Sequence, residues 1–354
     1  MIATVNSQVL AAELRLINRI VPSKPAIQIL SHVLLKADDG LGFYATDLEI
    51  GLATSCGAQV ALPGKVVASA AKLLALVEQC PDADVHLALE KGGIVVKCGA
   101  FRSVLQTMPV EDFPVPPSPD GTSWSLDGEG LRHLIRCTRY AINTVATKFV
   151  LQGALLTLNG TTAAMVATDG KRLALITMVR SGSDLQAVVP VKALDMLSTL
   201  TGPQVELIVG KRHLFFVAGK TLLISRMLEG QFPAYERIIP RSNMYFITVD
   251  KGALASALRR VNLLSEETQA VYFNLEPSTL NLSSFSAGIG NAAERVPVNY
   301  DGPIFKICIN GTHVLDFLNA AADSSIMLSL KDANSPLLLT DGQQHLGVIM
   351  TMRA

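Results

Sequence analysis

Apolar and polar residues alternate along this chain with two periodicities, one typical of helices and one typical of strands. Helix-like segments are expected at 9–21, 70–80, 130–142, 191–200, 251–264 and 311–321. Shorter β-rich runs predict strands at 27–36, 85–89, 93–98, 155–158, 205–209, 214–217, 245–249 and 336–340, separated by turn sequences such as Asn159-Gly160. Strands outnumber helices and follow one another at hairpin distance. This pattern favours antiparallel α+β domains over a parallel doubly wound sheet.

The pattern repeats along the chain with a period of about 120 residues. Leu10, Leu131 and Leu254 begin equivalent helix-like segments, 121 and 123 residues apart. The sequence Ala-Thr-Asp ends at Asp47 and again at Asp169, 122 residues later. Three copies of one fold predict a scaffold with a geometric purpose more than an enzyme built around a pocket.

The repeat divides the chain into three expected domains, 1–118, 119–240 and 241–354. A stiff linker is expected near the first boundary, where residues 114–119 contain four prolines. The second boundary is expected near 240–243. Domains of about 118 residues are large enough to bury their own cores.

Composition narrows the class of protein further. Apolar residues make up 49% of the chain and charged residues 17%, so disorder is not expected. No apolar stretch is long enough to predict a spanning helix, and early charges such as Glu13 and Arg15 argue against a secretory signal. Five scattered cysteines without a paired motif favour free thiols in a reducing cytoplasm and argue against zinc.

Charge is zero overall but differs between the thirds. Lys and Arg minus Asp and Glu gives 9 − 11 = −2, 13 − 9 = +4 and 8 − 10 = −2 for the three expected domains. Any surface for nucleic acid must therefore be local.

The search for catalytic chemistry finds little. Residues 288–293 resemble a degenerate dinucleotide fingerprint, but a hairpin turn is the simpler interpretation. The six histidines show no metal-ligand spacing. Asp47 and Asp169 occupy equivalent places in two copies, which favours a repeated turn over acid–base work. We therefore expect no enzyme activity, no cofactor and no metal.

Basic residues recur on equivalent helices of all three copies. Arg132, Arg136 and Arg139 lie at i, i+4 and i+7 and share one helical face. A solvated face is the ordinary explanation for each set alone. Their recurrence predicts a positive lining that holds phosphates without reading bases. The other members are Arg15, Arg19, Lys72, Lys192, Arg259 and Arg260.

The apolar run at 346–353 ends the chain. Half of its side chains are expected in a final core strand. The other half, which includes two methionines, predicts an adaptable surface for a partner peptide.

Taken in order, these stretches resemble the bacterial sliding clamps, the beta subunit of DNA polymerase III, over essentially the whole chain. The most specific stretches are 167–174, 228–237, 309–318 and 350–353, supported by 24–30 and 107–114. The resemblance implies a head-to-tail homodimer closed into a ring, with helices inside and sheets outside. Such a ring is a processivity factor that encircles double-stranded DNA and slides without sequence specificity. Its implied partners are the DNA polymerase III catalytic subunit, an ATP-dependent clamp loader, and other polymerases and repair proteins that carry short linear motifs, in the cytoplasm at the nucleoid.

The resemblance also implies three sets of site residues. The partner-peptide cleft between the second and third domains would be lined by Leu151, Thr168, Gly170, Lys171, Arg172, Leu173, Pro233, Arg237, Ile238, Asn310, His313, Val348, Met350, Met352 and Arg353. The residues facing DNA would be Arg15, Arg19, Lys24, Lys72, Arg132, Arg136, Arg139, Lys148, Lys192, Arg259 and Arg260. At the dimer interface, Leu105 of one subunit would pack against Leu263 and Leu264 of the other.

Several positions depart from the family pattern. They are Ser103, Lys171, Gln269, His313, Thr351 and Ala354, and the neutral net charge is also unusual. Two alternatives therefore stay open beside the main clamp: a divergent or accessory clamp, and a peptide-binding adaptor with a weakened ring. A nucleotide-dependent enzyme built on residues 288–293 is the third hypothesis.

Overall fold

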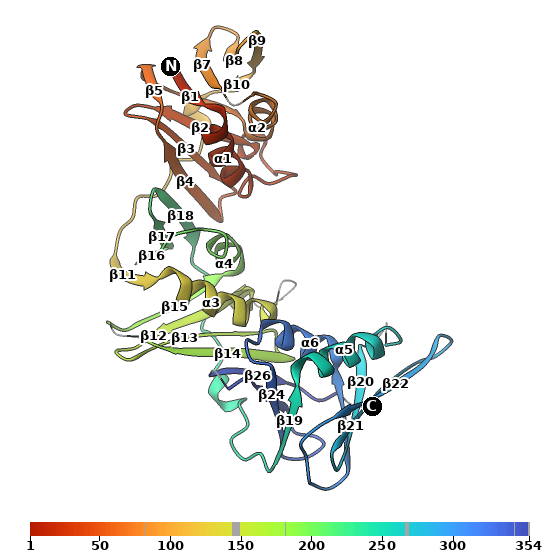
Figure 1. The fold of residues 1–354 in the computed structure, drawn as a ribbon. Coiled ribbons are helices and arrows are strands. Elements are labelled where there is room, and N and C mark those ends of the chain that lie inside the picture. Colours follow the sequence, from red (N-terminus) through yellow and green to blue (C-terminus); the bar gives the residue numbers. More distant parts are fainter. Residues whose placement is uncertain (82, 144–148, 181, 266–268, 343, 353–354) are drawn as a thin grey trace. The chain divides into compact units, whose positions relative to one another are not determined.

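The computed structural model describes residues 1–354 apart from 82, 144–148, 181, 266–268, 343 and 353–354 (Figure 1). Within the described part, α-helices fall on all six segments expected from the sequence. They are α1 (Ser7–Asn18), α2 (Ala70–Glu78), α3 (Gly128–Thr138), α4 (Val191–Leu197), α5 (Lys251–Asn262) and α6 (Gly311–Ala320).

The described strands form three runs that follow the sequence repeat. The first run is β1 (Ile2–Asn6), β2 (His32–Ala37), β3 (Leu41–Thr46), β4 (Ile50–Cys56), β5 (Gln59–Leu62), β6 (Gly64–Ser69), β7 (Asp84–Glu90), β8 (Gly93–Cys98), β9 (Phe101–Leu105) and β10 (Thr107–Met108). The second is β11 (Thr122–Asp127), β12 (Gly153–Leu158), β13 (Thr162–Thr168), β14 (Arg172–Val179), β15 (Leu185–Pro190), β16 (Gln204–Val209), β17 (His213–Ala218) and β18 (Thr221–Arg226). The third is β19 (Tyr245–Asp250), β20 (Ala270–Glu276), β21 (Thr279–Ser286), β22 (Gly290–Pro297), β23 (Phe305–Asn310), β24 (Ser325–Leu330), β25 (Leu337–Thr340) and β26 (His345–Ile349).

Equivalent strands pair in the same way in each repeat. The strand before the first helix pairs antiparallel with the strand after the second helix, as β1–β7, β11–β16 and β19–β24. The strands that lie between the two helices close a second sheet through β2–β6, β12–β15 and β20–β23. The expected antiparallel α+β fold and its internal repetition are confirmed.

The chain forms two compact units. Unit 1 contains residues 1–129 and 195–227, and unit 2 contains residues 130–194 and 228–354. In unit 1, β4 pairs with β18, which joins strands of the first and second repeats into a nine-stranded sheet. In unit 2, β14 pairs with β26 and joins the second and third repeats into an eight-stranded sheet.

Apolar spacing explains why the helices form and where they pack. Leu10, Leu14 and Ile17 of α1 are spaced by four and three residues and are fully buried in unit 1. In unit 2, Leu254 and Leu258 of α5 are buried in one cluster with residues of α6 and of the sheets. The helix starts are capped at equivalent places, since Asn6 and Asp250 accept backbone N–H groups of α1 and α5.

One strand expectation is wrong in its first half. The run 27–36 begins with a 3-10 helix at Gln28–Ser31, and β2 starts only at His32. The backbone N–H of Leu30 donates to the carbonyl of Ile27 at 3.1 Å, which closes this turn. Burial of Ile29 and Leu30 then holds the turn against the core.

Two other sequence interpretations, the hairpin and the free thiols, are confirmed. Residues 288–293 lie at the hairpin between β21 and β22, where Ser286 pairs with Gly290. All five cysteines are free, and four of them are buried. Among the described residues, none of the helices has the length and apolar character that a membrane crossing requires.

Candidate functional site

A tight turn between β13 and β14 organises the predicted cleft in unit 2. The Thr168 hydroxyl donates to the carbonyl of Arg172 at 2.7 Å and accepts the N–H of Gly170 at 3.1 Å. The Asp169 carboxylate accepts the N–H groups of Lys171 and Arg172 at 2.8 and 2.9 Å. Gly170 has φ +86°, a conformation that glycine adopts without steric cost.

Unit 1 contains the same turn. Thr46 donates to the carbonyl of Ile50 at 2.8 Å, and Asp47 accepts the N–H groups of Glu49 and Ile50 at 2.9 and 2.8 Å. The turn-forming interpretation of the repeated Thr-Asp pair is therefore confirmed. Where unit 2 has Gly170, unit 1 has Leu48 at φ +77°, a strained conformation for a residue with a Cβ.

Arg172 is held in place rather than free in the cleft. Its side chain is 14% exposed and donates to the Asp169 carboxylate at 3.0 Å and to the Asp316 carboxylate. Its guanidinium also lies 5.6 Å from the centre of the Tyr140 ring. Burial raises the pKa of the Tyr140 phenol above its usual range. Arg172 therefore ties the turn to α6 and gives the cleft a rigid edge.

The floor of the predicted cleft is apolar. Leu151, Leu173 and Val348 belong to one buried cluster that also contains Phe232. Leu173 of β14 pairs with Val348 of β26, so the floor crosses the junction between the second and third repeats.

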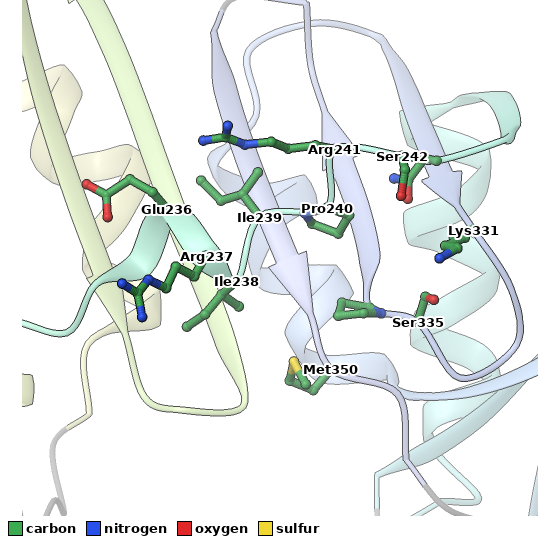
Figure 2. Close-up of a pocket in the computed structure, with 12 residues that line it drawn as sticks. Glu236, Arg237, Ile238, Ile239, Pro240, Arg241, Ser242, Lys331, Ser335 and Met350 are labelled. Atoms are coloured by element: carbon green, nitrogen blue, oxygen red, sulfur yellow. The ribbon is translucent and has the colours of Figure 1, made fainter.

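Exposed residues form the wall beside this floor. The N–H of Met350 donates to the carbonyl of Lys171 at 2.9 Å, which holds the segment just after β26 against the Thr-Asp turn. Met350 is 42% exposed and Ile238 is 39% exposed. Arg237, Ile238 and Met350 line one pocket of about 820 Å³. Figure 2 shows these side chains around it. Pro233 is exposed just before the short 3-10 helix at Tyr235–Arg237.

The start of α6 supplies two predicted cleft residues. The side-chain carbonyl of Asn310 accepts the N–H groups of Thr312 and His313 at 3.0 and 3.1 Å, so it caps the helix. His313 is half-buried. Burial and the charge of Arg172 lower the pKa of His313 from its usual value of 6.5, so the imidazole is neutral at pH 7.

The unusual positions are accommodated by local hydrogen bonds. Gln269 accepts the Thr312 hydroxyl at 2.6 Å. The Thr351 hydroxyl donates to the carbonyl of Asn334 at 3.1 Å, and the N–H of Met352 donates to the carbonyl of Cys308 at 2.8 Å. Arg353 and Ala354 lie outside the described residues.

Sequence reasoning missed nine of the twelve residues that line this pocket. Pro240, Arg241, Lys331 and Pro336 line it beside Met350. The only signal was their place after the 228–237 stretch and before β25, because neither segment carries a chemical motif of its own.

The predicted DNA-facing residues divide between the two units. Arg19, Lys24 and Lys72 are exposed in unit 1, as is Arg15, whose Nε donates to Glu78 at 2.8 Å. In unit 2, Arg136 and Lys192 are exposed, and Arg132 and Arg139 are partly buried on α3 and the turn after it. Arg259 donates to Asn319 at 3.1 Å, and Arg260 donates to Glu294 at 2.8 Å. Lys148 lies outside the described residues.

Two of the predicted DNA-facing cations, Arg15 and Arg260, thus form ion pairs with carboxylates. Helix spacing alone could not show these pairs. Glu78 and Glu294 each offset a positive charge on an exposed helix. The net positive charge available to attract DNA phosphates is therefore smaller than the number of basic residues alone would predict.

Two unpaired sheet edges carry the predicted dimer contacts. β9, which contains Leu105, is the last strand of a five-stranded sheet in unit 1, and β22 is the last strand of a four-stranded sheet in unit 2. Leu263, just after α5, is 69% exposed, whereas Leu264 is half-buried. Sequence reasoning missed the exposed Phe101 and Val104 of β9 and the exposed Phe285 and Ile289 at the β21–β22 hairpin.

Comparison with known proteins places this geometry in context. Three family models match the chain: DNA polymerase III beta subunit, N-terminal domain at residues 1–117, central domain at 125–234 and C-terminal domain at 236–353. The beta sliding clamp of Caulobacter vibrioides is 34% identical over 96% of this chain and 95% of its own length. That of Pseudomonas putida is 30% identical over 99% of both.

Solved structures agree with these matches. The DNA polymerase III subunit beta from Pseudomonas aeruginosa superposes with a TM-score of 0.94 at 30% identity, and covers 100% of both chains. A DnaN sliding clamp from the same organism, bound to griselimycin, superposes with a TM-score of 0.93 at 29% identity, also over 100% of both chains.

Proposed function

Because this chain belongs to the family of bacterial sliding clamps, the DNA polymerase III beta subunits, we propose that it is a replicative processivity factor. It closes as a head-to-tail homodimer around duplex DNA, tethers the polymerase and slides without sequence specificity. Its action is mechanical, and no reaction is assigned to it. We also propose domain boundaries near residues 118 and 240, where the repeat begins anew.

The ring is inferred from the way in which successive repeats join, because equivalent strands pair at both junctions within the chain. β4 of the first repeat pairs with β18 of the second, and β14 of the second pairs with β26 of the third. By the same rule, β22 of the third repeat requires the strand equivalent to β18 and β26. Within one chain the first repeat offers that strand as β9, which a second copy supplies head to tail.

Side chains at the two edges support this pairing. Phe101 and Val104 on β9 are 46% and 38% exposed, and Phe285 and Ile289 beside β22 are 68% and 54% exposed. Unpaired edges with exposed apolar side chains are unfavourable in water unless another strand covers them. Two such heterologous contacts close a dimer and leave no free end.

The basic helices support a sequence-independent grip on DNA. Lys and Arg side chains attract phosphates through counterion release, an interaction that carries no base information. A clamp needs this weak attraction, since base-specific hydrogen bonds would stop it from sliding. Lys24, Lys72, Arg136 and Lys192 are the cations we assign first, because their side chains are exposed.

The apolar floor and its exposed methionine support partner binding. A short linear motif would place apolar side chains over Leu173 and Val348 and against Met350. The polymerase catalytic subunit, the clamp loader and repair polymerases would compete for this one cleft. A peptide-binding adaptor without a ring is not favoured, because the matches to clamps span the whole chain.

Native mass measurement and retention on DNA test the ring. The expected mass is twice the chain mass of 37.8 kDa. After loading, the protein should stay on closed circular duplex and leave when the circle is cut. A monomer that dissociates from circular and linear DNA at the same rate would refute the proposal.

A further inference from the structure

The pocket beside Met350 extends past the predicted cleft into a segment with a distinct chemistry. Its lining runs from Glu236 to Asn243 on one side and through Lys331, Ser335 and Pro336 on the other. At about 820 Å³, it has room for several residues of a bound peptide. Only Arg237, Ile238 and Met350 of this lining belong to the predicted cleft.

Positive charge surrounds an apolar surface in this extension. Ile238, Ile239, Pro240, Pro336 and Met350 provide the apolar lining. The cations are Arg237, Arg241 and Lys331, and all three are exposed. Figure 2 shows the charged ends of Arg237 and Arg241 on one side of Pro240 and Lys331 on the other.

Two acidic residues lie in or next to the lining of the extension. Glu236 is the one acidic residue of the lining, and it acts on Tyr235, whose pKa is raised by burial and then by the Glu236 charge. The Asp332 carboxylate, next to Lys331, accepts the N–H groups of Asn334 and Ser335 at 2.9 Å each. These two carboxylates offset part of the positive charge, but the three cations Arg237, Arg241 and Lys331 exceed them by one, so the extension favours an anionic occupant.

We propose that this extension selects partner peptides whose apolar anchor is flanked by acidic residues. The inference rests on the proposed clamp function, and it assigns Arg241 and Lys331 as determinants of partner specificity. A peptide fits better than a DNA backbone, because phosphates would leave the apolar lining without a partner. Rim charges of this kind mainly speed encounter and reject uncharged competitors.

Binding of matched fluorescent peptides tests the proposal. One peptide carries a Leu-Phe anchor with two aspartates on each side, and the other carries asparagines in their place. Three exposed ion pairs, each worth about twofold, predict that the aspartate peptide binds roughly eightfold more tightly at low salt. The difference should shrink at high salt. It should also disappear in the double variant Arg241→Glu/Lys331→Glu.

A double variant with the same charge change controls for net charge. Lys211→Glu/Arg212→Glu alters two exposed residues outside the pocket and should keep the eightfold preference. The asparagine peptide should bind all three proteins equally, which reports an intact cleft. Retention on circular duplex should not differ between Arg241→Glu/Lys331→Glu and the parent protein.

The outcomes separate this inference from the function on which it rests. Equal binding of both peptides to the parent protein would overturn the inference and leave the cleft in place. A preference that survives Arg241→Glu/Lys331→Glu would overturn it as well. Binding of neither peptide would overturn the cleft itself. Weaker retention on DNA with an unchanged peptide preference would assign these cations to DNA instead.

Discussion

A proline scan of the free edge tests ring closure at the level of single backbone groups. In a strand, successive N–H groups point to opposite sides. Of Ser103 and Val104, one therefore donates toward β8 and the other points away from it, toward the strand that the partner copy would supply. Proline removes the N–H, and its ring blocks the approach of a neighbouring strand.

The size of the effect follows from the internal junctions. The β4–β18 junction pairs four residues of each strand and the β14–β26 junction pairs five, so we expect a similar length between subunits. One lost backbone hydrogen bond costs about 1 kcal/mol, and the ring contains two identical junctions. A loss of about 2 kcal/mol raises the dimer dissociation constant roughly 30-fold, and the clash of the proline ring adds to this.

Sedimentation and thermal unfolding of Ser103→Pro and Val104→Pro provide the assay. The variant whose N–H faces outward should keep its melting temperature as a monomer and dissociate at least 30-fold more readily. The other should lose melting temperature, because it breaks the β8–β9 ladder. Alanine at each position serves as the control. The reasoning fails if both proline variants dimerise as tightly as their alanine controls.

Three further predictions concern stability. Glu13, 6% exposed, pairs with the more exposed Lys220, which lies just before β18. Lys220→Met should lower the free energy of unfolding by about 1–3 kcal/mol in urea titrations, because it leaves the buried Glu13 carboxylate without its cation. Glu13→Gln should cost less, because it removes the buried charge and leaves only a solvated ammonium; a larger loss for Glu13→Gln would contradict this reasoning. Leu48→Gly should raise the melting temperature slightly by relieving a strain of about 1 kcal/mol, whereas Gly170→Ala should lower it, and opposite signs would refute the shared turn. The lowered pKa of His313 stabilises the fold above pH 6.5, and this contribution is lost as the pH falls through the folded-state pKa. Stability should therefore drop as the pH falls below 6.5, and His313→Gln should flatten that drop; an unchanged slope would exclude His313.

Local patterns predicted much of this structure. Helix positions were predictable because apolar residues at helical spacing, such as Leu10 and Leu14, report burial within a few turns. The Thr-Asp turn was predictable because Asp169 bonds to backbone groups only two and three residues away. The strand prediction for 27–36 was wrong in its first half because β-rich composition does not distinguish a strand from a short buried turn. Ile29 and Leu30 are buried in such a turn before β2 begins.

The candidate site was less predictable, because its partners are far apart in the chain. Arg15 meets Glu78 across 63 residues, Arg260 meets Glu294 across 34, and Arg172 meets Asp316 across 144. Spacing on a helix identifies which cations share a face. It does not show which of them a distant carboxylate has already neutralised.

The amino-acid sequence by itself determined that the chain contains three copies of one fold, because each repeat has its own helix starts, turns and core residues. Only the tertiary structure decided how the repeats join. Pairing of β4 with β18 and of β14 with β26 depends on hydrogen bonds between strands more than 160 residues apart. Among the described strands, β9 and β22 each keep one neighbour and lie at an edge of their sheets. Backbone hydrogen bonds leave no signature in side-chain pattern, so the free edges that predict the ring became visible only in the fold.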